Sequence, residues 1–245
     1  MIETGGLIRS LSGRRAARNF HTFVINEIGQ SIVTGAFAIG SVLPTDAQMM
    51  ERYGVSRTVL REALKTLEAK GLVEARPKVG TRVSPRSRWN FFDPLVLAWH
   101  FEAPPDRKFY QSLFRTRGVL EKPMVELSAR HRTAEHVRLL KYWCHQMETA
   151  GDSLEQFGLA ALEVHGIIAE SSQDLLLRSV IGVVELTLAL ALTREEAIPA
   201  SEYRERSAAL FVLVAQAIES GNAEAAREHY DATRRLDSEQ VLGVQ

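Results

Sequence analysis

Residues 43–83 hold the feature that most constrains the fold: two capped helices joined by a glycine turn, followed by a basic hairpin. Gly54 is predicted to end the first helix, because glycine readily takes the left-handed conformation needed there. Ser56 stands at the expected N-cap of the second helix, where its hydroxyl can accept from free backbone N–H groups. The first helix begins with a capping box made by Thr45 and Gln48. The segment therefore predicts a helix-turn-helix.

The second of these helices has two distinct faces. Apolar residues recur at helical spacing from Val59 to Leu67, which predicts a buried face. Arg57 and Arg61 lie four residues apart on another face, near the end from which recognition helices read bases. An arginine fork can bind guanine or phosphate through two hydrogen bonds. Solvated surface arginines are the alternative, but the agreement of caps, turn and apolar face favours DNA.

The hairpin is predicted to have strands at 72–76 and 80–84, joined by a three-residue turn. Arg76, Lys78 and Arg82 give it cationic side chains suited to phosphate or minor-groove contact. A further amphipathic helix is expected to begin at residue 20. Together these elements predict a winged helix-turn-helix of three helices and a small β-hairpin wing.

The charge of the chain is zero overall but unevenly distributed. Residues 1–88 hold 14 Lys and Arg against 7 Asp and Glu, and the rest holds 16 against 23. A basic first part suits DNA, whereas an acidic second part would be repelled by it. The distribution predicts a DNA-binding part followed by a part with another task.

Four motifs carry a resemblance to a known family. They are L-P-x-D at 43–46, GVSRTVLREAL at 54–64, L-x-x-x-G-L-V at 67–73 and G-T-x-V at 80–83. They resemble the GntR family of bacterial transcription regulators. With the cap residue, the DNA-contacting residues that we expect are Thr45, Ser56, Arg57, Thr58, Arg61, Lys78, Gly80 and Thr81. Ala47 departs from the family pattern, since many members carry an arginine there.

The expected domain organisation has four parts. Residues 1–19 are predicted to be a disordered basic arm, with Arg9 among its arginines and DNA contact as the alternative role. Residues 20–84 form the winged helix-turn-helix, 85–92 a linker, and 93–241 an all-helical domain for effector binding and dimerisation. Candidate helices of that domain are 94–101, 106–130, 133–150, 153–171, 174–194, 201–220 and 222–241. They predict an α-helical bundle of six to seven helices.

A winged helix followed by a helical bundle is similar to the FadR-like subfamily of GntR regulators, whose bundle is called the FCD domain. Arg117 and Glu121 match its R-x-x-x-E helix, whose arginine commonly faces the effector pocket. The alternative is an ion pair between the two within the helix. The segment 89–102 resembles repressors of galactonate operons, which implies a sugar acid as effector, although its aromatic residues could be purely structural.

Many FCD domains bind a divalent metal through D-x-x-x-H and two later histidines. Here His165 matches the first histidine, but the other three ligand positions are Ala161, Phe211 and Thr233. One imidazole does not hold a metal tightly, so no metal cofactor is expected, with His165 and His229 as weak candidates. His165 could instead donate a hydrogen bond to an effector or be a core histidine.

The remaining signals limit the class of protein. The single cysteine, Cys144, and the lack of a signal peptide favour a cytoplasmic location. The longest apolar run, 180–192, is too short to span a membrane. No nucleophile elbow, phosphate loop or H-E-x-x-H is present, so an enzyme is not expected, a metal-dependent one being the remote alternative.

We therefore expect a homodimeric repressor that binds double-stranded, palindromic operator DNA. A small acidic effector bound in the helical domain would control it. A regulator that responds to acyl-coenzyme A, or has no ligand, is the alternative.

Overall fold

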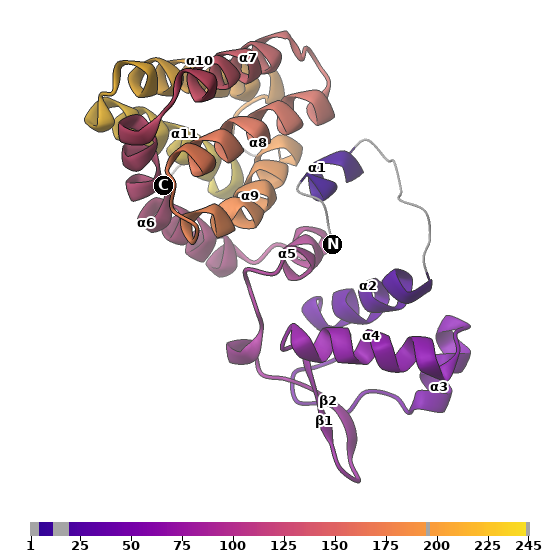
Figure 1. The fold of residues 1–245 in the computed structure, drawn as a ribbon. Helices are drawn as coiled ribbons and strands as arrows, with labels where there is room; N and C mark the ends of the chain where they lie inside the picture. The colour runs from indigo at the N-terminus through magenta and orange to yellow at the C-terminus, as the bar shows by residue number, and fades with distance from the viewer. Residues whose placement is uncertain (1–4, 12–19, 195–196, 244–245) are drawn as a thin grey trace. The chain divides into compact units, whose positions relative to one another are not determined.

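The computed structural model describes residues 5–11, 20–194 and 197–243, and divides into two compact units (Figure 1). The N-terminal unit comprises residues 15–105. The C-terminal unit comprises residues 106–245 together with the first 14 residues of the chain.

The N-terminal unit contains the predicted winged helix-turn-helix. Its elements are α2 (Phe20–Val33), α3 (Asp46–Tyr53), α4 (Arg57–Ala69), β1 (Val73–Arg76) and β2 (Gly80–Val83). Gly54 ends α3 in the left-handed conformation, with φ of 64°. Thr45 and Gln48 form both hydrogen bonds of the capping box, and the Ser56 hydroxyl accepts from the backbone of Val59. The apolar faces of the three helices meet in one core, which also includes Leu72, Val73 and Val83 at the base of the hairpin.

The wing is an antiparallel pair in which Val73 faces Val83 and Arg76 faces Gly80. A third extended segment lies beside β2, because Leu43 N donates to Thr81 O at 2.8 Å and Val83 N donates to Ser41 O at 2.9 Å. The hairpin extends away from the helices in Figure 1. Three paired segments hold its base, while its tip is held by one pair of strands.

Gly71 determines how the chain leaves α4. Its φ is 78°, and a side-chain carbon at this position would lie 2.0 Å from the carbonyl oxygen of Arg88. Only glycine fits such an approach in this conformation. Residue 71 therefore fixes the segment after the wing against the start of the hairpin.

The segment after the wing also belongs to the N-terminal unit. It forms a 3₁₀ turn η1 (Arg86–Arg88) and α5 (Pro94–Glu102). Trp99 occupies the space left by Gly29 of α2, where a side-chain carbon would come within 2.4 Å of the indole. Lys70 pairs with Asp93 at 2.6 Å. The sequence expectation that the helical domain starts at residue 93 thus differs from the structure, because these contacts attach α5 to α2 and α4.

The C-terminal unit is a helical bundle. Its longer helices are α6 (Arg107–His131), α7 (Ala134–Thr149), α8 (Leu154–Ser171), α9 (Ile181–Thr193), α10 (Ala200–Ser220) and α11 (Ala223–Leu242). Helix α6 packs along α11, and α10 packs along both α11 and α7. The predicted helix 174–194 begins later, because Asp174 accepts from the backbone of Leu176 and Leu177 and a 3₁₀ turn η2 (Leu177–Val180) follows. The prediction of an all-helical domain is confirmed.

The expectation of a disordered arm is wrong for residues 5–11. This segment forms α1 (Gly6–Ser10), whose Ile8 is fully buried in the C-terminal unit. The rest of the predicted arm, residues 1–4 and 12–19, lies outside the described residues. The sequence hid this contact because three apolar residues, Leu7, Ile8 and Leu11, are too few to give a periodic pattern.

Among the described residues, we find no helix with the length and apolar character needed to cross a membrane.

Candidate nucleic-acid interface and a buried polar cluster

The first turn of α4 presents an exposed cationic surface. Arg57 and Arg61 are exposed, and their guanidinium groups make no hydrogen bond or ion pair with any described residue. Thr58, between them in sequence, is exposed too. A helix N-terminus carries partial positive charge, so an arginine there gains nothing from the helix dipole. These cations are available to an external anion, as expected for a recognition helix.

The two cap residues already use their hydroxyls inside the protein. Thr45 Oγ1 lies 3.0 Å from Gln48 Oε1 and also accepts from Gln48 N. Ser56 Oγ accepts from Val59 N at 3.4 Å, which leaves its O–H able to donate. Capping is thus the demonstrated role of both residues, and DNA contact stays a prediction for them.

The wing offers fewer available cations than its sequence implied. Arg76 pairs with Glu74 at 2.8 Å, and Arg82 Nε donates to the carbonyl oxygen of Gly40. Lys78, at the tip, is exposed with φ of 63° and has no hydrogen bond or ion pair to the described residues. Lys78 is therefore the wing cation best placed for phosphate.

The other two wing candidates, Gly80 and Thr81, follow directly in β2. Gly80 is exposed and Thr81 is partly buried. Thr81 also accepts a backbone hydrogen bond from Leu43 through its carbonyl, so its position is fixed by the third strand segment. The structure brings Lys78, Gly80 and Thr81 together at one end of the hairpin.

Arg117 lies at the centre of a second candidate site, which we call the buried cluster. It consists of side chains from α6, α8, α9, α10 and α11, namely Arg117, Glu121, His165, Thr187, Tyr203, Tyr230 and Asp237. Arg117 is wholly buried and donates from Nε to Glu121 at 2.9 Å. Its Nη1 donates to Thr187 Oγ1 and to Asp237 Oδ2, both at 2.8 Å.

Two tyrosines and a histidine complete the buried cluster. Tyr203 donates to Asp237 Oδ1 at 2.8 Å. The hydroxyl of Tyr230 lies 2.5 Å from His165 Nδ1 and 3.4 Å from Glu121 Oε1. The predicted effector residues Arg117, Glu121 and His165 are therefore brought together, with Tyr230 as the link.

The environment of the buried cluster sets its protonation. Burial would lower the pKa of Arg117, but Glu121 and Asp237 outweigh this and raise it, so the guanidinium stays charged. Burial raises the pKa of Glu121, although Arg117 opposes the change. Burial and the nearby Arg117 hold the pKa of His165 well below its ordinary value, so its imidazole is neutral. One cation thus faces two carboxyl groups, and the pKa of one of them, Glu121, is raised.

Two polar atoms of the buried cluster lack partners. Arg117 Nη2 and Glu121 Oε2 are both inaccessible to solvent, and neither has a hydrogen-bond partner within the described part of the chain. Buried polar atoms in folded proteins are nearly always paired, because leaving one unpaired is costly. A ligand that accepts a hydrogen bond from Arg117 Nη2 and donates one to Glu121 Oε2 would pair both atoms.

The residues at the family's metal positions do not fit a metal. Phe211 sets its ring edge-on to His165, with centroids 5.0 Å apart, and Ala161 is a buried methyl group. Thr233 donates its hydroxyl to the backbone carbonyl of Tyr230 at 2.8 Å. In the described ranges there is no group of three or more His, Cys, Asp or Glu that could hold a metal ion, and His229 joins none.

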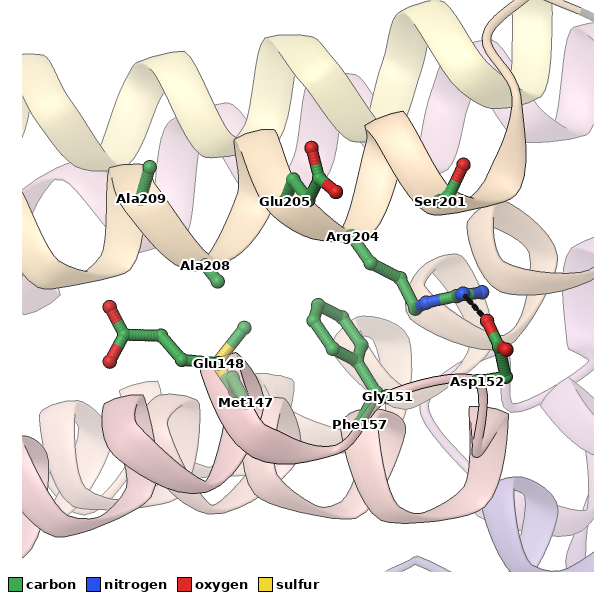
Figure 2. A pocket seen from close by; sticks show the side chains of 10 residues that line it. All are labelled: Met147, Glu148, Gly151, Asp152, Phe157, Ser201, Arg204, Glu205, Ala208 and Ala209. Carbon is green, nitrogen blue, oxygen red and sulfur yellow. Dashed lines mark hydrogen bonds and ion pairs between the residues drawn. The ribbon is translucent and has the colours of Figure 1, made fainter.

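A surface pocket of about 390 Å³ lies elsewhere in the C-terminal unit, between α10 and the turn that joins α7 to α8 (Figure 2). Arg204 and Asp152 form an ion pair of 2.8 Å at one end of it. None of the predicted effector residues lines this pocket. The candidate effector site is therefore the buried cluster rather than this surface hollow.

Sequence reasoning missed four members of the buried cluster: Thr187, Tyr203, Tyr230 and Asp237. They lie 70 residues or more from Arg117, and no local motif connects them. The one available signal was the Arg117–Glu121 pair itself, because an arginine that faces a pocket needs more partners than one carboxylate of its own helix.

The fold and the exposed surface of α4 together define a winged helix-turn-helix protein with a helical C-terminal domain. Residues 21–83 match the family described as bacterial regulatory proteins, gntR family, and residues 112–234 match the FCD domain. The FCD match alone covers half of the sequence. The chain belongs to the gntR family of bacterial regulatory proteins, in the subfamily that carries an FCD domain. This confirms the predicted family and agrees with the expectation of a regulator rather than an enzyme.

Relatives of known name match part of the chain. A protein of Escherichia coli K12 described as uncharacterized HTH-type transcriptional regulator YieP is 38% identical over 120 residues, which is 49% of this chain and 52% of the relative. The galactonate operon transcriptional repressor of the same organism is 28% identical over 148 residues, 60% of this chain and 65% of the repressor. The chain thus spans about half to two-thirds of the length of these relatives.

Solved structures support the fold. A structure of Lar, described as controlling expression of the Listeria monocytogenes agr system, superposes with a TM-score of 0.66 at 16% identity, over 94% of this chain and 100% of that one. The structure of Escherichia coli McbR/YncC gives a TM-score of 0.51 at 20% identity, over 89% and 95% of the two chains. At these identities the likeness concerns the fold alone.

Proposed function

We propose that this chain is an operator-binding transcription regulator that acts as a repressor. The observation that carries the proposal is the pair of exposed arginines, Arg57 and Arg61, on the first turns of a capped helix, which form no ion pair with any residue that the structure describes. A protein gains nothing in stability from cations placed this way, whereas a DNA phosphate or guanine would satisfy them. The name of the galactonate operon transcriptional repressor supports the sign of regulation.

The form that binds DNA is a homodimer on a palindromic operator. A helix-turn-helix of this kind reads a few base pairs in one major groove, so two copies give an operator of useful length. Two-fold symmetry in the protein is then matched by symmetry in the DNA. Lys78 at the tip of each wing would add phosphate contact beside the site of α4.

The effector that we propose is a small hydroxy acid, such as a sugar acid, bound at the buried cluster. Its carboxylate or hydroxyl oxygens would accept from Arg117 Nη2, and a hydroxyl would donate to Glu121 Oε2, the two atoms without partners. Because Arg117 already faces Glu121 and Asp237, an incoming carboxylate must displace one of them or bind together with a proton. A ligand with several hydroxyl groups suits this site better than a simple fatty acid.

The operator function is tested by selecting bound sequences from a random pool of double-stranded DNA with the purified protein. Enrichment of an inverted-repeat motif supports the proposal. Recovery of an unenriched pool contradicts it.

The effector is tested separately by thermal-shift measurements with galactonate, gluconate and an acyl-coenzyme A. A ligand that binds the folded state raises the melting temperature by mass action. Stabilisation by a sugar acid that disappears in Glu121→Gln supports the proposed site. Stabilisation by the acyl-coenzyme A alone favours the other effector class, and no shift with any of them favours a regulator without a ligand of these classes.

A further inference from the structure

Helix α1 packs against α8 and α9 through closely fitted apolar contact. Ile8 of α1 is fully buried there. A side-chain carbon added to Gly158 of α8 would lie 2.7 Å from Ile8 and 2.9 Å from Leu192 of α9. The absence of a side chain at residue 158 therefore makes the room that Ile8 occupies.

A buried carboxylate fastens the same contact. Glu185 of α9 is 6% exposed, and its Oε1 accepts from Leu7 N at 2.7 Å and from Ile8 N at 3.3 Å. The first amides of a helix have no partner within the helix. A buried carboxylate is costly unless it receives hydrogen bonds. Docking of α1 thus satisfies groups on both sides of the contact.

The order of the chain gives this contact a consequence. The N-terminal unit, which holds the proposed DNA-binding surface and is called the DNA-binding unit below, lies in sequence between α1 and α6, both of which belong to the C-terminal unit. With α1 docked, the DNA-binding unit is joined to the C-terminal unit at both of its ends. Leu11 and Phe20 are nine residues apart in the sequence, so they can lie at most about 30 Å from each other.

We propose that residues 5–11 are a strap and that the surface of α8 and α9 around Gly158 and Glu185 is its dock. While the strap is docked, the range of positions open to the DNA-binding unit is restricted. When it is released, only the connection after α5 restrains that unit.

The dock shares its helices with the buried cluster. Glu185, which holds the strap, is two residues from Thr187, which accepts from Arg117. Gly158 and His165 are seven residues apart on α8 and so lie on similar faces of it. A ligand that shifts α8 or α9 would thereby also alter the dock. For the ligand to release the strap, it must bind the released state more tightly than the docked state.

Hydrogen–deuterium exchange of the full chain tests the docking. The variant Gly158→Ala places a methyl group where Ile8 sits, while alanine favours the helix. Gly166→Ala is the matched control, since it is in the same helix and a side-chain carbon there meets no atom within 4 Å. We expect peptide 5–11 to exchange faster in Gly158→Ala than in the control or the unchanged protein. Equal exchange in all three proteins would overturn the docking.

Distance measurement tests the strap itself. Nitroxides at Glu51→Cys and Thr149→Cys report the separation of the two units by electron–electron double resonance, with labelled chains diluted in unlabelled protein. Cys144 stays unlabelled, because it is buried and its pKa is raised to about 12 by burial. We expect a broader distance distribution in Gly158→Ala than in Gly166→Ala. Distributions of equal width would refute the strap, whatever the operator or effector proves to be.

Discussion

Replacing Arg117 with methionine tests whether its positive charge balances the carboxyl groups of Glu121 and Asp237 in the buried cluster. The guanidinium is fully buried and hydrogen bonds Glu121, Thr187 and Asp237, at 2.8 to 2.9 Å. Its removal leaves Glu121 and Asp237, which are 1% and 4% exposed, without their shared cation. Breaking a buried pair in this way costs about 3–5 kcal/mol, because an uncompensated charge stays buried.

The same variant should gain stability as the pH falls. Without the cation that opposes it, burial raises the pKa of Glu121 further in the folded protein, so the folded state binds more protons than the unfolded one in mildly acidic solution. Stability therefore rises with falling pH, and the deficit of Arg117→Met should be smaller at about pH 5.5 than at about pH 8. The triple variant Arg117→Met, Glu121→Gln, Asp237→Asn removes the charges together and should recover most of the loss.

Urea unfolding followed by far-ultraviolet circular dichroism measures this, since α6 to α11 supply most of the helical signal. An alanine at exposed Arg138 is a suitable control for loss of a cation, because Arg138 forms only a surface pair with Glu135 among the described residues. A loss of under about 1 kcal/mol for Arg117→Met, or a loss that does not depend on pH, would refute the role of Arg117 as the shared cation of Glu121 and Asp237.

Three further results are expected. Because the pKa of His165 is lowered by burial and by Arg117, the unfolded state binds a proton below about pH 6.5 that the folded state does not, so stability falls by about 1.4 kcal/mol per pH unit there. His165→Gln should flatten this part of the profile of stability against pH, and an unchanged slope would exclude the assignment. Arg61→Ala should reduce the slope of log affinity for DNA against log salt concentration by about 1, and Arg138→Ala should leave the slope unchanged. Salt titrations followed by fluorescence anisotropy measure both slopes. Gly54→Ala should lower the free energy of unfolding by about 1–2 kcal/mol, because Gly54 has a positive φ. Gly71→Ala should lower it by more in thermal unfolding, because Gly71 has a positive φ and its added carbon would also meet a backbone carbonyl. Equal losses for the two variants would contradict the close approach at Gly71.

Much of the N-terminal unit was predictable because its signals are local. Gly54, Ser56 and the capping box at Thr45 each act within four residues, and the structure has all three. The available charge of the wing was not predictable, since the partner of Arg82 is a carbonyl 42 residues away. Local sequence signals thus predict the helices and strands, but they do not predict which cationic side chains remain without a partner inside the protein.

The C-terminal unit shows the same limit more strongly. Helical spacing gave most of its helices within one or two residues, for instance 153–171 for α8 (Leu154–Ser171). It could not show that Asp237 and Tyr203 surround Arg117, because side chains from separate helices meet only after packing. The docking of α1 was hidden for that reason too, and because Glu185 looks in sequence like an interruption of an apolar helix.

We infer that α4 binds DNA through its exposed arginines. The most direct test is the affinity of Arg57→Ala for the DNA sequence selected by the unchanged protein, with Arg138→Ala as the matched control. We expect a loss of about 1–3 kcal/mol for Arg57→Ala and relaxed specificity at one position of the site, with the control unchanged. Equal affinities for the three proteins would contradict the claim.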